Sequence, residues 1–194
     1  MKAPFGVILA GGRATRMGGG DKALLRLGPA TILDHVIDRL APQVGRLALN
    51  ANGDPARFAA WGLPVLPDDP PDFAGPLAGI LAGLDWAAAQ GADHIVTAAG
   101  DTPFLPCDLV PRLQLAAGTR PVALAASATG RHPTFGLWSV ALRDDLRSAL
   151  AEGMRKVSHG ADLHDAATAT FADDEAFFNV NTPDDLDRAR AMLG

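Results

Sequence analysis

The sequence of 194 residues contains one cysteine, Cys107, and no tyrosine. A single cysteine excludes a disulfide within the chain and a zinc site built from cysteines. The missing tyrosine excludes a tyrosine as catalytic acid or base. The formal net charge is −5 and there is no long basic run, which argues against sequence-independent binding of nucleic acid. No apolar stretch approaches the roughly 18 residues that span a bilayer, and residues 1–4 leave no room for a signal peptide. We therefore expect a cytoplasmic protein with neither a membrane nor a nucleic acid as partner.

The chain does have a high apolar fraction, 48% of its residues, which suffices for one substantial core. We expect a single domain over residues 1–194. Apolar runs typical of buried strands alternate with segments whose apolar residues recur at helical spacing. This alternation predicts an α/β fold, a three-layer Rossmann-like sandwich with a mostly parallel sheet. The late segments are expected to add an antiparallel edge to that sheet.

The expected elements follow one another along the whole chain. Strands are predicted at residues 6–10, 46–50, 63–66, 94–99, 121–126, 135–140, 167–171 and 177–181. Helices are predicted after a Thr31 cap, at 54–61, from Pro76, at 107–117, at 139–151, from 155, and after a Thr182 cap. On this reading, residues 127–133 form a loop between two strands, and Arg131 and His132 lie in it.

The first expected strand leads into a loop that holds five glycines, two arginines and a lysine between residues 11 and 22. Glycines let backbone N–H groups face an anion, and nearby cations neutralise it. Open α/β sheets bind ligands at the carboxyl ends of their strands. The loop matches neither G-x-x-x-x-G-K-[ST], because Ala23 follows Lys22, nor G-x-G-x-x-G. It therefore predicts a phosphate site of another kind.

Polar residues also follow two other expected strands. Asn50 ends the strand at 46–50, where its amide suits either a nucleobase edge or a plain turn. Asp101 follows the strand at 94–99, where a carboxylate can hold a divalent metal beside phosphates or cap a turn. The glycines of the helix from Pro76 suggest close approach of backbone or ligand, or simple tight packing in the case of Gly83. Arg131 and His132 suit a second anionic ligand or plain solvation.

The string L-A-G-G-x-x-x-R-M-G-x-x-D-K at residues 9–22 resembles the loop of a nucleotidyltransferase family. Members of that family transfer a nucleoside monophosphate from a nucleoside triphosphate to a phosphorylated acceptor. Further matches occur in the family's order: Asn50-Ala51-Asn52, Asp68, Gly75-Pro76-Leu77-Ala78-Gly79, Gly100-Asp101-Thr102-Pro103, Arg131-His132-Pro133-Thr134 and Asn179-Val180-Asn181-Thr182-Pro183. Within the family, the chain is most similar to the molybdenum cofactor guanylyltransferases, which join GMP to molybdopterin.

Two details bear on this resemblance. Related cytidylyltransferases usually carry LAAG in place of LAGG and lack the Gly-Pro-Leu-Ala-Gly block, so Gly11 favours guanine. The family often has Pro-Cys before its metal-binding aspartate, where this chain has Ala99-Gly100. A small residue at that place should leave the Asp101 carboxylate usable.

The resemblance implies transfer of GMP from GTP to the terminal phosphate of molybdopterin or Mo-molybdopterin, with release of pyrophosphate and with Mg²⁺ as cofactor. It implies contacts to the nucleotide from Leu9, Ala10, Gly11, Gly12, Lys22, Asn50, Asp68 and Asp101. In this set Lys22 would bind the phosphates, Asn50 and Asp68 the base and ribose, and Asp101 the metal. From its loop position we add Arg16 to the catalytic residues Lys22 and Asp101. The pterin side is expected to use Arg131, His132, Asn179 and Asn181.

Two other functions remain open at this stage. The first is a cytidylyl- or sugar-phosphate nucleotidyltransferase that uses the same loop with another acceptor. The second is a non-catalytic module that binds GTP or pterin, against which Lys22 and Asp101 argue. For the guanylyltransferase itself, proteins that deliver or receive the cofactor are further candidate partners.

Overall fold

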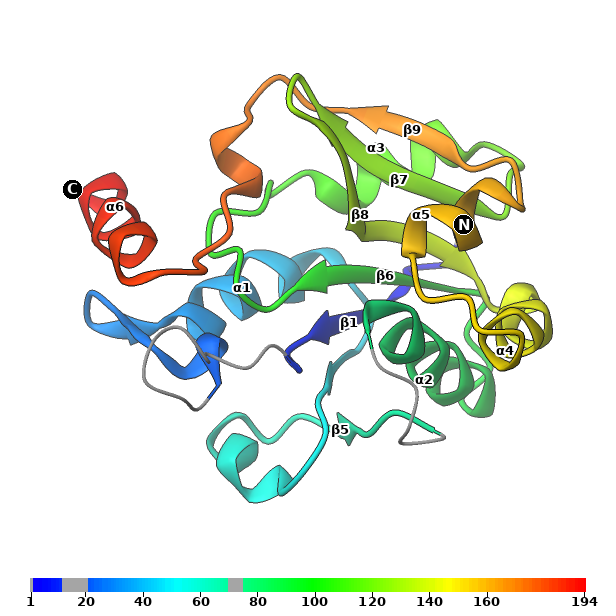
Figure 1. Cartoon of the computed structure of the whole chain (residues 1–194), viewed down its shortest axis with the longest axis horizontal. Helices are drawn as coiled ribbons and strands as arrows, with labels where there is room; N and C mark the ends of the chain where they lie inside the picture. The colour runs from blue at the N-terminus through cyan, green and yellow to red at the C-terminus, as the bar shows by residue number, and fades with distance from the viewer. Residues whose placement is uncertain (1, 12–20, 70–74) are drawn as a thin grey trace.

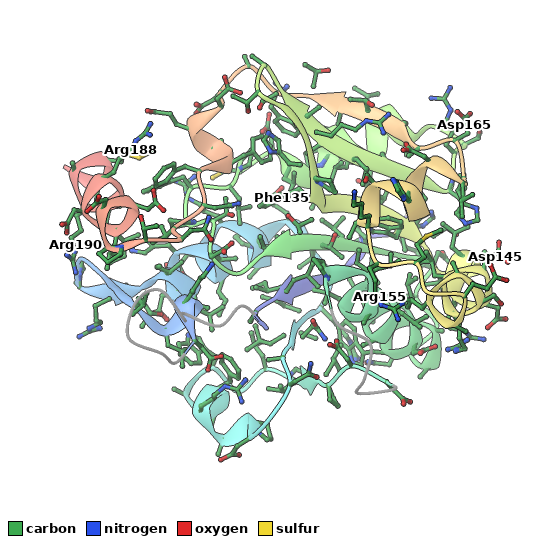
Figure 2. All side chains as sticks on the ribbon, in the orientation of Figure 1. Phe135, Asp145, Arg155, Asp165, Arg188 and Arg190 are labelled. Carbon is green, nitrogen blue, oxygen red and sulfur yellow. The ribbon has the colours of Figure 1, made fainter. Side chains whose placement is uncertain are left out.

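The computed structural model describes residues 2–11, 21–69 and 75–194. Its main feature is a seven-stranded sheet with the order β5-β4-β1-β6-β8-β7-β9 (Figure 1). The strands are β1 (Phe5–Leu9), β4 (Leu47–Asn50), β5 (Val65–Leu66), β6 (His94–Ala99), β7 (Val122–Ser127), β8 (Gly130–Ser139) and β9 (Ala167–Thr170). All of them run parallel except β8, which is antiparallel to both β6 and β7. A separate hairpin joins β2 (Arg26–Leu27) to β3 (Ala30–Thr31).

Helices cover both faces of the sheet. Buried residues of α1 (Ile32–Leu40), α3 (Leu109–Ala117) and α6 (Pro183–Leu193) belong to one apolar core, and those of α2 (Pro76–Ala89), α4 (Arg143–Ala151) and α5 (Val157–Asp162) belong to another (Figure 1). The short 3₁₀ helices are η1 (Lys22–Leu24), η2 (Ala41–Gln43), η3 (Pro55–Trp61), η4 (Val140–Leu142) and η5 (Glu175–Phe177). The predicted α/β sandwich with a mostly parallel sheet is confirmed. None of the described helices has the length and apolar character needed to cross a bilayer.

The central strands supply both cores because successive side chains point to opposite faces. On β1, Val7 packs into the core with α2, and Ile8 packs into the core with α1. On β6, Ile95 likewise packs into the core with α2, and Val96 packs into the core with α1. Strands covered on both faces need apolar residues at every position, which explains the continuous apolar runs in the sequence.

The two helix starts predicted from threonine caps are confirmed. Thr31 Oγ1 accepts a hydrogen bond from Asp34 N at 3.1 Å, and Thr31 N donates to Asp34 Oδ2 at 2.7 Å. Thr182 and Asp185 make the same reciprocal pair at the start of α6, at 3.2 and 2.9 Å. Each pair satisfies two backbone N–H groups that have no partner within the helix.

The prediction of a strand at 177–181 is wrong. The segment leaves η5 and crosses the carboxyl edge of the sheet, where Val180 N donates to Asp101 O at 2.9 Å. The prediction that an antiparallel strand forms the outer strand of the sheet is also wrong. The outer strand β9 runs parallel to β7, and the antiparallel strand β8 lies inside the sheet. The alternation of apolar and polar residues at 178–181 has another cause: the asparagines bind Thr102 and Lys22, which lie far away in the sequence.

The loop predicted around Arg131 and His132 is wrong as well. Both residues belong to β8, where Arg131 pairs with Ala126 and His132 with Ala125. The strand pairing is interrupted after His132, since the next pair joins Gly136 to Leu124. Pro133 lies in that interruption, and a proline has no N–H to donate to a neighbouring strand. The proline therefore interrupts the ladder without ending the strand.

Candidate active site

The candidate site lies at the carboxyl end of β1, where the direction of strand order changes. In the sheet, β4 lies on one side of β1 and β6 lies on the other. Leu9, the last residue of β1, is in register with both Asn50 and Ala99. The backbone then continues the pairing, since Ala10 N donates to Asn50 O at 2.8 Å and Gly100 N donates to Leu9 O at 3.0 Å. Three strand ends therefore meet at one level, at the place where open α/β sheets bind ligands.

Two glycines permit this close convergence. A Cβ added to Gly100 would lie 3.1 Å from Ala10 Cα, and one added to Gly79 on α2 would lie 2.1 Å from Asn50 Oδ1. Any side chain at Gly79 would displace the Asn50 amide. By contrast, a Cβ on Gly83 would meet Val7 Cγ2 at 2.8 Å, which is packing of the helix on the sheet. The group that approaches Gly79 is thus the Asn50 side chain rather than a backbone segment, whereas the simple packing predicted for Gly83 is confirmed.

On the β4 side, Asn50, Asn52 and Asp68 form a connected hydrogen-bond group. Asn50 Nδ2 donates to Asp68 Oδ1 at 2.8 Å, and Asn52 Nδ2 donates to Asp68 Oδ2 at 2.7 Å. Asn52 Oδ1 in turn accepts from Asp68 N at 2.8 Å. Only 7% of Asn50 and 9% of Asp68 is exposed. The group is therefore held in one arrangement before any ligand binds.

On the β6 side, Lys22 and Asp101 form a half-buried ion pair. Lys22 Nζ lies 3.6 Å from Asp101 Oδ2, and the two side chains are 18% and 23% exposed. Burial raises the pKa of Asp101, although the charge of Lys22 opposes that rise. A small cavity of about 20 Å³ lies between them and the end of β1, lined by Leu9, Ala10, Lys22, Ala23, Gly100 and Asp101.

Residues 179–181 complete this second group. Lys22 Nζ donates to Asn181 Oδ1 at 2.5 Å, and Thr102 Oγ1 donates to Asn179 Oδ1 at 2.5 Å. Between these two contacts, Val180 N binds the Asp101 carbonyl. The structure thus brings Asn179 and Asn181, expected on the pterin side, next to the proposed metal and phosphate residues.

Arg131 and His132 stand apart from that group, at the start of β8. His132 Nε2 lies 2.7 Å from Ser127 Oγ, and the imidazole stacks on Phe177 with 4.1 Å between ring centroids. Burial lowers the pKa of His132, although Asp174 opposes the change. Arg131 is more exposed, and its guanidinium donates to Asp162 Oδ1 at 2.6 Å. Both residues still lie at the edge of the sheet where β6 and β7 end.

The remaining predicted residues belong to the loop after β1. Ala10 is buried, whereas Gly11 is exposed and its backbone is accessible to a ligand. Among the described residues, no atom lies within 4 Å of the place that a Cβ on Gly11 would take. Gly12 and Arg16 lie outside the described residues.

The donor set at Asp101 suits a metal that the nucleotide helps to hold. Within the described part of the chain, no group of three or more His, Cys, Asp or Glu side chains could enclose a metal ion. Mg²⁺ commonly binds one or two carboxylates and completes its octahedron with substrate phosphates and water. A single carboxylate next to a lysine that suits phosphate fits this pattern.

Three residues of the site were missed from the sequence. Asn52 and Thr102 occur in the motifs that carry the resemblance, so their spacing next to Asn50 and Asp101 was an available signal. Arg57 had none, because its guanidinium reaches Asp21 Oδ2, at 2.6 Å, only through the fold. Thr102 is fully buried, so its hydroxyl needs the partner that Asn179 provides.

Comparison with known proteins places these features in a family. Residues 6–167 match the MobA-like NTP transferase domain. A protein of Cereibacter sphaeroides named molybdenum cofactor guanylyltransferase is 55% identical over 97% of this chain and 96% of its own length. A protein of the same name from Mesorhizobium japonicum is 52% identical over 97% and 95%.

A solved structure supports the fold. The molybdopterin-guanine dinucleotide biosynthesis protein A of Archaeoglobus fulgidus superposes with a TM-score of 0.77 at 20% identity, covering 97% of this chain and 98% of that protein. The resemblance drawn from the sequence motifs is confirmed by the near-full-length similarity to the proteins from Cereibacter sphaeroides and Mesorhizobium japonicum. The chain belongs to the family of molybdenum cofactor guanylyltransferases, within the MobA-like NTP transferase domains, and is a nucleotidyltransferase.

Proposed function

We propose that this enzyme transfers GMP from GTP to the terminal phosphate of molybdopterin or Mo-molybdopterin and releases pyrophosphate. One observation carries the proposal: a buried polar group suited to a base and a half-buried one suited to phosphates flank the end of β1 at the same level. The name that the relatives share supports guanine as the base and the molybdenum cofactor as the product.

In this proposal the β4 side binds the nucleoside. Asn50 and Asp68 contact base and ribose, because amide and carboxylate groups can match a base edge or a ribose hydroxyl. Backbone groups of Leu9, Ala10, Gly11 and Gly12 contact the nucleotide at the carboxyl end of β1. Since the Asn50–Asp68 contact already exists at 2.8 Å, little side-chain freedom is lost when the nucleotide binds.

The β6 side neutralises the phosphates. Lys22 supplies a compact positive charge, and Arg16 supplies a second one from the loop. Asn181 holds the Lys22 ammonium in place through its side-chain oxygen. Asp101 would hold Mg²⁺, which would supply positive charge to neutralise the pyrophosphate leaving group.

The reaction needs no protein nucleophile. A terminal phosphate oxygen of molybdopterin forms a bond to the α-phosphorus of GTP while the bond from that phosphorus to the pyrophosphate oxygen breaks. The acceptor is already ionised at neutral pH, so no strong general base is required. The enzyme aligns two polyanions and offsets their repulsion. Arg131, His132, Asn179 and Asn181 are proposed to position the pterin.

The test is to incubate the purified protein with Mg²⁺, molybdopterin and either GTP or CTP, and to identify the product by mass spectrometry. We expect the guanylylated pterin and pyrophosphate, with much less product from CTP. A product formed from CTP and not from GTP would contradict the guanine assignment.

The metal role is tested with Asp101→Ala and a matched control, Asp93→Ala. Asp93 also pairs with a lysine, Lys2, but 61% of its side chain is exposed. We expect the Asp101 variant to lose about 100-fold or more in rate, and the control to retain its rate. Equal product from wild type and Asp101→Ala would show that the proposed metal role is wrong.

A further inference from the structure

Arg57 on η3 contacts two parts of the nucleotide site that lie far apart in the sequence. Its Nε donates to Asp21 Oδ2 at 2.6 Å, and one terminal nitrogen donates to the Asn52 carbonyl at 2.6 Å. The other terminal nitrogen donates to the Asp54 carbonyl at 2.5 Å. Three of its nitrogens thus meet three acceptors, a pattern that only a planar guanidinium provides.

The surroundings of Arg57 hold this side chain in one orientation. Its guanidinium carbon lies 4.6 Å from the ring centroid of Phe58, which is only 1% exposed. Gly53 has a φ of +86°, and a Cβ there would lie 3.3 Å from an Arg57 nitrogen. The chain therefore turns closely around the guanidinium, and a larger residue than glycine would strain the turn.

The two ends of this contact belong to the two groups of the site. Asp21 directly precedes Lys22, and its carbonyl accepts from Leu24 N at 3.1 Å in the turn that carries the lysine. Asn52 holds Asp68 through two hydrogen bonds. Arg57 is thus joined at one end to the residue before the phosphate lysine and at the other to the group that faces the base.

Charge gives Arg57 a second effect. The Asp21 side chain is 15% exposed, so its carboxylate is weakly screened by water. Asp21 directly precedes Lys22. Without a partner, its carboxylate would repel the phosphates of a bound nucleotide. Arg57, itself 25% exposed, neutralises that charge through a direct ion pair.

We propose that Arg57 is a positioning residue for the nucleotide. It fixes the separation between Lys22 and the Asn52–Asp68 pair, and it cancels the charge of Asp21, without contacting the substrate itself. This inference rests on the proposed function, which gives GTP as the nucleotide, Lys22 as its phosphate contact and the Asn50–Asp68 group as its base contact.

The proposal predicts that a lysine does not replace this arginine. A single ammonium can keep the charge near Asp21 but cannot reach the Asn52 and Asp54 carbonyls in the same geometry. Arg57→Lys is expected to raise the KM for GTP about tenfold while kcat stays within about threefold. Arg57→Gln is expected to raise the KM further, because Asp21 is left without a counter-charge.

The experiment measures GTP binding by calorimetry with Mg²⁺ and steady-state rates for wild type, both Arg57 variants and the double variant Asp21→Asn/Arg57→Gln. The double variant removes the unpaired charge, so we expect it to bind GTP more tightly than Arg57→Gln alone. Arg147→Lys is the matched control, because Arg147 on α4 also uses two guanidinium nitrogens, which bind the carboxylates of Asp85 and Asp144. It should leave the KM unchanged.

Each outcome decides between the explanations. If Arg57→Lys lowers the melting temperature but keeps the wild-type KM, Arg57 only stabilises the fold and the inference is wrong. If the double variant binds GTP no better than Arg57→Gln, the charge effect is wrong. If wild type forms no guanylylated product, the proposed function fails, and the same comparison is made with the nucleotide that the enzyme does use.

Discussion

A lysine–aspartate pair lies at each end of the central strands, and the two pairs differ mainly in how far they are exposed to water. At the carboxyl edge, Lys22 and Asp101 are 3.6 Å apart and 18% and 23% exposed. At the amino edge, Lys2 and Asp93 are 3.9 Å apart and 77% and 61% exposed. An exposed pair of this kind contributes little, because water screens both charges. The buried pair keeps strong fields that can act on a bound phosphate.

The difference comes from what covers each pair. Asn181 is uncharged, but its Oδ1 accepts a hydrogen bond from the Lys22 ammonium and holds it in place. The backbone N–H of Val180 donates to the Asp101 carbonyl. Gly100 lets the strand ends approach one another beneath them. Burial and side-chain contacts, rather than the presence of a lysine and an aspartate, thus distinguish the candidate site. The following predictions test that distinction, from the largest expected effect to the smallest.

Lys22→Ala should have the largest effect. Removing the charge that we propose binds the phosphates is expected to lower kcat/KM about 100-fold or more. Lys2→Ala, the matched change at the other edge, should stay within about twofold of wild type. The measurement is the rate of pyrophosphate release. Similar losses in the two variants would mean that the buried pair has no special role.

Asp68→Ala should come next. It removes the carboxylate that joins the amides of Asn50 and Asn52 and leaves both without that partner. The KM for GTP should rise about tenfold to 100-fold, because the base-facing group loses its fixed arrangement. Asp108→Ala, which removes an exposed carboxylate paired with Arg112, is the control. An unchanged KM in the Asp68 variant would count against the nucleoside assignment.

Arg131→Ala should have a smaller and more selective effect. Arg131 is 42% exposed and bound to Asp162, so little binding energy is expected from it. We expect the KM for molybdopterin to rise about threefold to tenfold, with the KM for GTP unchanged. The control is Arg120→Ala, since Arg120 is 52% exposed and pairs with Asp165 at the other edge. A change in the KM for GTP would indicate that Arg131 contacts the nucleotide rather than the pterin.

Asp34→Asn should leave catalysis unchanged and affect stability alone. Asp34 accepts hydrogen bonds from Thr31 N and from Trp61 Nε1, both at 2.7 Å. Burial by itself would raise the pKa of Asp34, but these hydrogen bonds outweigh it and the pKa is lowered. The free energy of unfolding of the variant should be about 1–2 kcal/mol lower than that of wild type at neutral pH.

The pH dependence of that loss has a definite sign. Because the folded pKa of Asp34 is lowered, its stabilisation is complete above the unfolded value of about 3.9 and is lost as pH falls through the folded pKa. The difference between wild type and Asp34→Asn in urea unfolding should therefore be constant from pH 7 to 5 and narrow below about pH 4. Asp38→Asn, exposed on the same helix, is the control. A difference that grows on acidification would contradict the assignment.

Local patterns predicted the parts of the fold that depend on neighbouring residues. The Thr31 and Thr182 caps form as expected, because each needs only the residue three positions later. The strand at 94–99 forms as predicted, and Gly83 packs on the sheet as predicted. The strand prediction for residues 177–181 was wrong because their alternation of apolar and polar residues resembles that of an outer strand. Their polar residues are instead asparagines that bind Lys22 and Thr102.

The sequence by itself determined the layers of this protein and the end of the sheet at which its candidate site residues gather. Apolar runs buried on both faces require a covered parallel sheet, and polar residues that follow such runs must meet at its carboxyl edge. Only the tertiary structure decided which of those polar residues share a contact. Lys22 meets Asn181 and Asp21 meets Arg57 across long stretches of chain. Such contacts depend on strand order and on the course of each segment across the edge, which local spacing does not encode.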